Sequence, residues 1–76
     1  MTLTEVRDYL IGAGWRYIGT CGCSTNMYKY NHPTILGYEM RVGVKADRFE
    51  IRQNGRTIRQ GSTETFNQIY GSVFTA

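Results

Sequence analysis

The sequence feature that most constrains the fold is an alternating run of side chains from Tyr38 to Gln60. In its first part, apolar and charged residues alternate. The apolar residues are Tyr38, Met40, Val42 and Val44, and the charged residues are Glu39, Arg41 and Lys45. A period of two places alternate side chains on opposite faces of a β-strand. Phe49 and Ile51 continue the apolar face in a following strand. The run therefore predicts a meander of antiparallel strands with one buried face and one polar face.

Two short turns divide this run into three strands. Asn54-Gly55 indicates a two-residue hairpin, because both residues tolerate the positive φ of a type I′ turn. This turn predicts the opposed pairs Gln53 with Arg56, Arg52 with Thr57, Ile51 with Ile58, and Glu50 with Arg59. A second turn around Ala46-Asp47 predicts that Val44 opposes Phe49, Val42 opposes Ile51 and Arg41 opposes Arg52. In both hairpins, the apolar pairs share one face.

Amphipathic helices are expected at both ends of this chain. Thr2 followed by Glu5 has the form of a capping box, and apolar residues recur at helical spacing behind it, so we expect a helix from about residue 3 to 12. Gly12 and Gly14 supply its end. Ser62 or Thr63 is expected to cap a second helix, whose apolar stripe consists of Phe66, Ile69, Tyr70 and Val73.

Two further strands are predicted between the first helix and the alternating run. Residues 15–18 are aromatic and β-branched, residues 19–26 form a loop of small side chains, and residues 27–32 resume a strand pattern that Pro33 ends. The predicted order is α-β-β-β-β-β-α. We expect an α+β fold, a two-layer sandwich in which an antiparallel sheet of four to five strands carries both helices on one face. The length suits one small domain over residues 1–76.

Charge, hydropathy and cysteine count restrict the class of protein. Nine Lys and Arg against six Asp and Glu give a net charge of +3, which permits a nucleic-acid partner without requiring one. There is no apolar run of about 18 residues and no secretory signal pattern at Met1, so we expect a cytoplasmic protein without a membrane partner. Two cysteines are too few for a disulfide scaffold, which favours reduced thiols. A chain this short buries only about 60 to 65% of the surface that its unfolded form exposes, so its stability is marginal and a homo-oligomer is an open alternative.

The polar face of the predicted sheet is the first candidate site. An open basic sheet can hold phosphate groups, and Tyr28 or Tyr30 could stack unpaired bases beside it. The candidate nucleic-acid-binding residues are Arg41, Lys45, Arg48, Arg52 and Arg59. The alternative interpretation is a solvated face, because an antiparallel sheet with helices on one side shows polar residues on the other.

The second candidate is Cys21-Gly22-Cys23, with His32 as a third ligand for zinc. A structural zinc site takes four ligands, and its cysteines are usually separated by two to four residues. A redox pair and a loop whose cysteines simply pack are the alternatives, and neither Lys nor Arg stands in the loop to lower a thiol pKa. Apart from zinc, no cofactor is expected. Catalysis needs a nucleophile, a base and an orienting group, and the sequence indicates no such set, which favours a protein that is not an enzyme.

A helix ending in Gly14-Trp15, a strand, a glycine-containing loop and an aromatic strand ending in His32-Pro33 resemble the HicA-type toxins. The resemblance covers about residues 3 to 44. It implies a fold like that of the double-stranded-RNA-binding domain, with the order α-β-β-β-α, and ribosome-independent cleavage of messenger RNA. The family's catalytic histidine directly follows a Gly-Ser or Gly-Thr pair, whereas residues 22–26 here read Gly-Cys-Ser-Thr-Asn. With the extra Asn54-Gly55 hairpin, this departure argues against carrying over the nuclease activity, while the layered architecture is supported.

The resulting hypothesis is a small, non-catalytic binding module. It binds either protein or nucleic acid. If the partner is a nucleic acid, it is held at the basic sheet face, and such binding would weaken steeply with salt. The alternative is a protein-interaction or self-assembling module, such as a homodimer, that uses an exposed strand edge or the tyrosine-rich segment 27–32.

Overall fold

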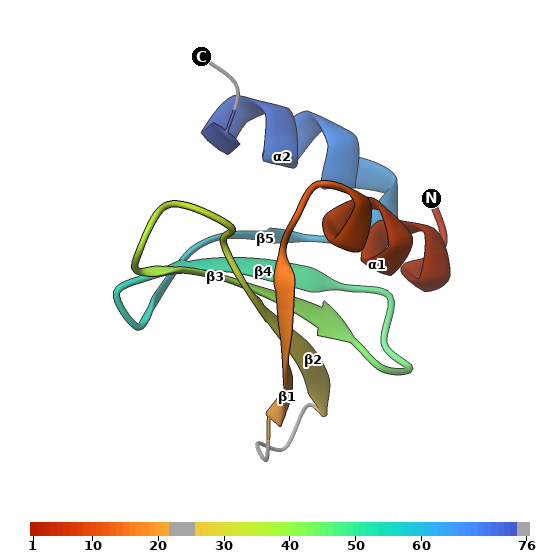
Figure 1. Ribbon diagram of the computed structural model, residues 1–76. Helices are drawn as coiled ribbons and strands as arrows, with labels where there is room; N and C mark the ends of the chain where they lie inside the picture. Colours follow the sequence, from red (N-terminus) through yellow and green to blue (C-terminus); the bar gives the residue numbers. More distant parts are fainter. Residues whose placement is uncertain (22–25, 75–76) are drawn as a thin grey trace.

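The computed structural model describes residues 1–21 and 26–74. The elements in chain order are α1 (Leu3–Gly12), β1 (Arg16–Cys21), β2 (Met27–Asn31), β3 (Tyr38–Gly43), β4 (Phe49–Gln53), β5 (Arg56–Gly61), the 3₁₀ turn η1 (Thr63–Thr65) and α2 (Phe66–Phe74). The five strands form one antiparallel sheet in the order β1-β2-β3-β4-β5, and both helices lie on the same side of it (Figure 1). The expected α+β architecture is confirmed.

The first helix begins and ends where its sequence signals predict. The Thr2 hydroxyl accepts a hydrogen bond from the Glu5 amide at 3.1 Å, and the Glu5 carboxylate accepts one from the Thr2 amide at 2.8 Å. Gly14 adopts a φ of +94°, and the next amide, that of Trp15, returns to the Leu10 carbonyl at 2.9 Å. This sharp turn directs the chain from the helix layer into the edge strand β1.

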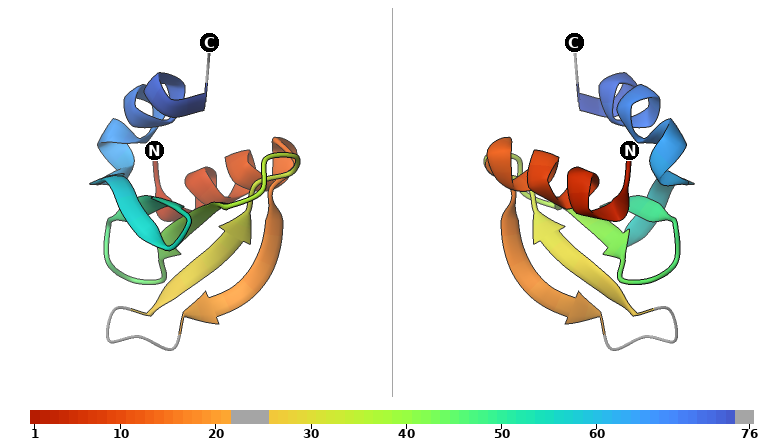
Figure 2. Two further views of the ribbon diagram at one scale, coloured as in Figure 1. Left: turned by 90° about the vertical axis from the view of Figure 1, so that its left-hand side faces the viewer. Right: turned by 90° about the vertical axis from the view of Figure 1, so that its right-hand side faces the viewer.

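The core lies between the helices and the side of the sheet that they cover, which we call the inner face. β3 and β4 contribute alternate residues to it, as the period of two predicts. The buried members are Val6, Leu10, Trp15, Tyr30, Met40, Val42, Phe49, Ile51 and Phe66. The opposite side of the sheet, which carries neither helix, is called the outer face; Figure 2 shows the sheet curling away beneath the helices along β1 and β2.

The β3–β4 hairpin has a different register from the expected one. Arg41 opposes Glu50 and Val42 opposes Phe49. The predicted pairs of Arg41 with Arg52, of Val42 with Ile51 and of Val44 with Phe49 are therefore wrong. The connection over residues 44–48 is longer than a tight turn and folds across Gly43, whose Cβ, if present, would lie 2.1 Å from the Ala46 carbonyl oxygen. The shift amounts to two residues, so each side chain stays on its predicted face.

The β4–β5 hairpin follows the prediction near its turn and departs from it further on. Asn54 and Gly55 have φ values of +51° and +82°, and Gln53 pairs with Arg56 as expected. A β-bulge then adds one residue to β5. The predicted pairs Ile51 with Ile58 and Glu50 with Arg59 are therefore wrong, and the observed pairs are Ile51 with Arg59 and Glu50 with Gln60.

The C-terminal helical segment begins differently from the expected capped helix. Ser62 precedes η1 without a side-chain capping bond, and α2 follows η1. The buried Thr63 instead donates from its amide and its hydroxyl to Asp47, at 3.0 and 2.6 Å, and these bonds lower the pKa of the Asp47 carboxyl. They tie the 44–48 loop to the helix layer. Within the described ranges, neither α-helix has the length and hydropathy to cross a membrane.

Candidate functional site

Two cross-strand rows of side chains cover the outer face. The register places Arg16, Asn31, Glu39, Arg52 and Thr57 in one row, and Gly19, Lys29, Arg41, Glu50 and Gln60 in the other. Arg48 precedes β4 and joins the second row through hydrogen bonds to Glu50 at 2.9 Å and to Gln60 at 3.2 Å. Adjacent strands lie about 4.8 Å apart, so long side chains of one row contact their neighbours.

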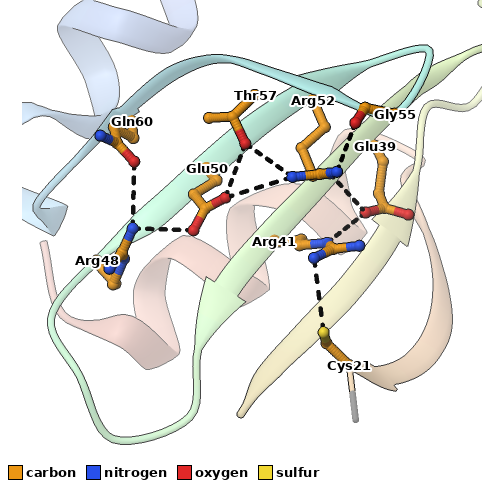
Figure 3. A network of polar contacts seen from close by, with 9 residues as sticks. All are labelled: Cys21, Glu39, Arg41, Arg48, Glu50, Arg52, Gly55, Thr57 and Gln60. Carbon is orange, nitrogen blue, oxygen red and sulfur yellow. Dashed lines mark hydrogen bonds and ion pairs between the residues drawn. The ribbon is translucent and has the colours of Figure 1, made fainter. Parts of the chain in front are cut away.

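Two glutamates link the arginines of the outer face into one network, which is drawn in Figure 3. Glu39 accepts a hydrogen bond from Arg41 at 2.5 Å and lies 3.8 Å from the Arg52 guanidinium. Glu50 pairs with Arg48 at 2.9 Å and with Arg52 at 3.8 Å. Arg52 therefore stands between both carboxylates. Ion pairs that share partners hold long side chains in defined positions more effectively than isolated surface pairs do.

Each nitrogen of the Arg52 guanidinium lies at hydrogen-bond or ion-pair distance from a partner in this network. One terminal nitrogen donates to the Thr57 hydroxyl at 2.8 Å, the other donates to the Gly55 carbonyl at 2.7 Å, and Nε faces Glu39. Arg41 uses Nε for Glu39 and Nη1 for the Cys21 sulfur at 3.6 Å, while its Nη2 makes none of these contacts. The Arg16 side chain makes no hydrogen bond or ion pair with any residue in the two described ranges. The three arginines thus differ in the donors that they can offer to a ligand.

The outer face carries the net charge of the whole chain. Five basic side chains lie there against two acidic ones; they are Arg16, Lys29, Arg41, Arg48 and Arg52 against Glu39 and Glu50. The other four basic and four acidic residues of the chain cancel, so the total of +3 resides on this one face. A modest charge that is concentrated on one surface produces a stronger local field than the same charge spread over the molecule.

A pocket of about 350 Å³ lies at one end of the outer face. Arg16, Glu39, Arg41 and Arg52 line it from the sheet, and the 32–37 loop and the Asn54-Gly55 turn line it from the side. The Asn54 amide donates to the Gly37 carbonyl at 2.9 Å, which joins the loop to the turn. The Leu36 side chain is 97% exposed and Ile35 is 50% exposed, so the wall presents apolar surface to solvent.

His32 holds the 32–37 loop in shape. Its Nδ1 accepts hydrogen bonds from the amides of Thr34 at 3.1 Å and Ile35 at 2.9 Å. Its ring packs against Trp15 at a centroid distance of 4.9 Å and against Phe74 at 5.4 Å. Burial among these rings lowers the pKa of His32, which favours the neutral form that can accept at Nδ1.

The structure brings together three of the five predicted basic residues. Arg41, Arg48 and Arg52 share the outer-face network. Lys45 is exposed in the 44–48 loop and lines a separate pocket beside Met27. Arg59 pairs with the core residue Ile51, because the bulge in β5 shifts it by one position out of the outer-face rows.

The proposal that Tyr28 or Tyr30 stacks bases beside the basic face is wrong. Both residues oppose core residues of β3, and Tyr30 is 1% exposed. The Tyr30 hydroxyl accepts a hydrogen bond from Arg7 Nε at 3.0 Å, a contact that raises the pKa of Arg7, and the same guanidinium lies 3.8 Å above the Tyr28 ring. The two tyrosines thus bind α1 to the inner face.

The predicted metal ligands are not brought together. Cys21 pairs with Met27 at one end of the β1–β2 hairpin, whereas His32 follows Asn31 at the other end. Cys21 is disulfide-bonded, so a reduced thiol at this position was a wrong expectation, and Cys23 lies outside the described residues. Residues 1–21 and 26–74 contain no group of three or more His, Cys, Asp and Glu side chains that could hold a metal ion.

Sequence reasoning missed Arg16, Asn31 and Lys29 as members of the outer-face rows. These residues belong to β1 and β2, and no tight turn with a recognisable sequence sets the register of these strands against β3.

The fold and the site define a small α+β module with a five-stranded antiparallel meander and a basic, helix-free sheet face. No family model, curated protein or solved structure matches the chain.

Proposed function

We propose that this protein is a nucleic-acid-binding module and that the outer face is its binding surface. The observation that carries the proposal is the concentration of the net charge of +3 on one open sheet face. Phosphate oxygens accept hydrogen bonds from arginine and lysine, and such contacts position a protein on a nucleic acid without reading its sequence. The partner is therefore recognised by its backbone charge.

Binding depends mainly on phosphate contacts. The two rows of the outer face hold no aromatic residue among the residues described, so base stacking adds little. Five basic side chains and two carboxylates have a net charge of about +3, which can neutralise about three phosphates. For a single strand, this corresponds to a slope of about −2 in a plot of the logarithm of the binding constant against the logarithm of the salt concentration. We expect a modest affinity, and the logarithm of the binding constant should fall linearly with the logarithm of the salt concentration.

The test is a titration of fluorescent RNA and DNA oligonucleotides at two salt concentrations, with variants matched in charge. Lys29→Gln and Arg48→Gln remove a positive charge from the outer face, and Arg56→Gln and Arg59→Gln remove one from outside its two rows. The first pair should weaken binding several-fold, and the second pair should change it by less than twofold. Absence of binding at low salt, or equal losses in both pairs, would reject the proposal.

Self-assembly through a strand edge is the competing function. β1 and β5 are the two edges, and Tyr17 and Ile18 of β1 are 49% and 44% exposed. However, each edge strand contains a β-bulge, which interrupts the regular row of backbone donors that a partner strand needs. The tyrosine-rich β2 is paired on both sides. A monomeric mass by light scattering at high concentration would reject self-assembly, and a dimer would favour it.

A further inference from the structure

We propose that the pocket at the end of the outer face binds the phosphate monoester of a nucleotide and that Arg16 is its principal donor. The proposal rests on the proposed function and adds a specific subsite to it. The pocket lies alongside the first row, so a nucleic-acid strand that crosses the two rows in the direction of the β-strands would place its terminal phosphate there. The shared chemistry is a phosphate monoester attached to a nucleoside, whether this is the end of a strand or a free mononucleotide.

The charge of the pocket suits a terminal phosphate better than an internal one. Three arginines and one glutamate line it, which leaves a net charge of about +2 with His32 neutral. A phosphate monoester carries about −1.5 to −2 at neutral pH, whereas an internal phosphodiester carries one negative charge. The monoester therefore gains more Coulomb energy from the same pocket than a diester does.

The arginines that line the pocket have two roles: some hold the outer-face network together, and others can donate hydrogen bonds to a ligand. Arg52 has all its nitrogens engaged, and Glu39 holds both Arg52 and Arg41. Arg16 keeps its whole guanidinium available, since it has no partner within the described ranges, and Arg41 keeps Nη2. A guanidinium can bind two phosphate oxygens at once with parallel hydrogen bonds. Arg16 can therefore supply a bidentate contact without breaking the outer-face network.

The walls of the pocket limit the length of what enters it. The 32–37 loop and the 54–55 turn are joined through the Asn54 amide and the Gly37 carbonyl, and Gly37 approaches so closely that a Cβ there would lie 2.4 Å from the Asn54 side-chain oxygen. A volume of about 350 Å³ is near the lower limit for small-molecule pockets, which suits one nucleotide. The apolar side chains of Ile35 and Leu36 offer a surface for its base or sugar.

The experiment compares a short oligonucleotide with a 5′-phosphate, with a 3′-phosphate and with neither, together with the corresponding nucleoside monophosphates, by fluorescence anisotropy and competition. We expect one terminal phosphate to tighten binding about fivefold to tenfold. Arg16→Gln should reduce this ratio to about one. Lys29→Gln, the matched variant on the same face but outside the pocket, should weaken all oligonucleotides equally and keep the ratio. Circular dichroism of each variant checks that it is folded.

The outcomes separate this inference from the proposed function. If oligonucleotides bind but neither terminal phosphate changes the affinity, the pocket assignment is wrong and the binding face stands. If a mononucleotide competes only when it carries phosphate and only when Arg16 is present, the pocket assignment holds even if an unphosphorylated strand does not bind. A terminal-phosphate preference that survives Arg16→Gln would overturn the role of Arg16.

Discussion

Glu50 should stabilise the fold and oppose ligand binding, and Glu50→Gln therefore separates the two effects. The Glu50 side chain is 13% exposed, pairs with Arg48 and Arg52, and accepts a hydrogen bond from the Thr57 hydroxyl at 3.0 Å. Glutamine keeps the shape of the side chain and removes its charge. Arg48 then loses its pairing with Glu50, and Arg52 keeps only its pairing with Glu39.

The magnitudes follow from these contacts. One ion pair is at hydrogen-bond distance, the other is longer, and Arg48 is 39% exposed, so we expect a loss of about 1 kcal/mol in the free energy of unfolding. In a domain of this size, such a loss lowers Tm by roughly 4–8 °C. Removing one negative charge about 6 Å from a bound phosphate is worth roughly 0.7 kcal/mol in water, or about threefold tighter binding.

The assay combines thermal unfolding with the oligonucleotide titration. Glu64→Gln removes the same charge from an exposed position on η1, which belongs to the helix layer, and serves as the matched control. Glu50→Gln should lower Tm and tighten binding, whereas Glu64→Gln should leave Tm nearly unchanged and affect binding by less than twofold. If Glu50→Gln weakens binding, or if both variants tighten it equally, the assignment of binding to the outer face is refuted.

Two further predictions concern the loops. Burial lowers the pKa of His32 in the folded protein, so the contribution of His32 to stability is fully present above the pKa of about 6.5 in the unfolded chain and is lost as the pH falls below it. Urea unfolding should therefore show a decline in the free energy of unfolding between pH 7.5 and 5.5. The decline should be absent in His32→Gln, because the chain has one histidine. Asp47→Ala removes both hydrogen bonds between the 44–48 loop and η1, and Thr63→Val removes the one from the hydroxyl, so each variant should lower Tm. The double variant should lower the free energy of unfolding by less than the sum of the two single losses, and strict additivity would show that the two residues do not interact.

Local sequence patterns were sufficient for α1, for the presence of the five strands and for the faces of the central strands, but not for the 3₁₀ turn η1 that precedes α2. The capping box at Thr2 and the glycine at position 14 determined α1 because capping depends on residues within one turn of the helix. The alternation from Tyr38 onward placed Arg41 and Arg52 opposite the core for a similarly local reason, since successive side chains of a strand point to opposite sides.

Strand register required the tertiary structure. A shift of two residues leaves every side chain on the same face, so the hydrophobic pattern cannot distinguish Arg41 opposite Arg52 from Arg41 opposite Glu50. The observed choice depends on the 44–48 loop, which folds across Gly43 and is tied to Thr63 far along the chain. The bulge in β5 likewise moved Arg59 out of the outer-face rows, although the Asn54-Gly55 turn was predicted correctly.

What the sequence by itself determined about this protein is which residues form helices and strands and which face of the central strands is polar. Only the tertiary structure decided that Arg16 and Lys29 join that face, that the glutamates connect its arginines, and that two loops close a pocket at its end. The physical reason is range: caps, turns and alternation act between neighbouring residues, whereas these contacts join strands whose relative positions are set by packing of the whole core.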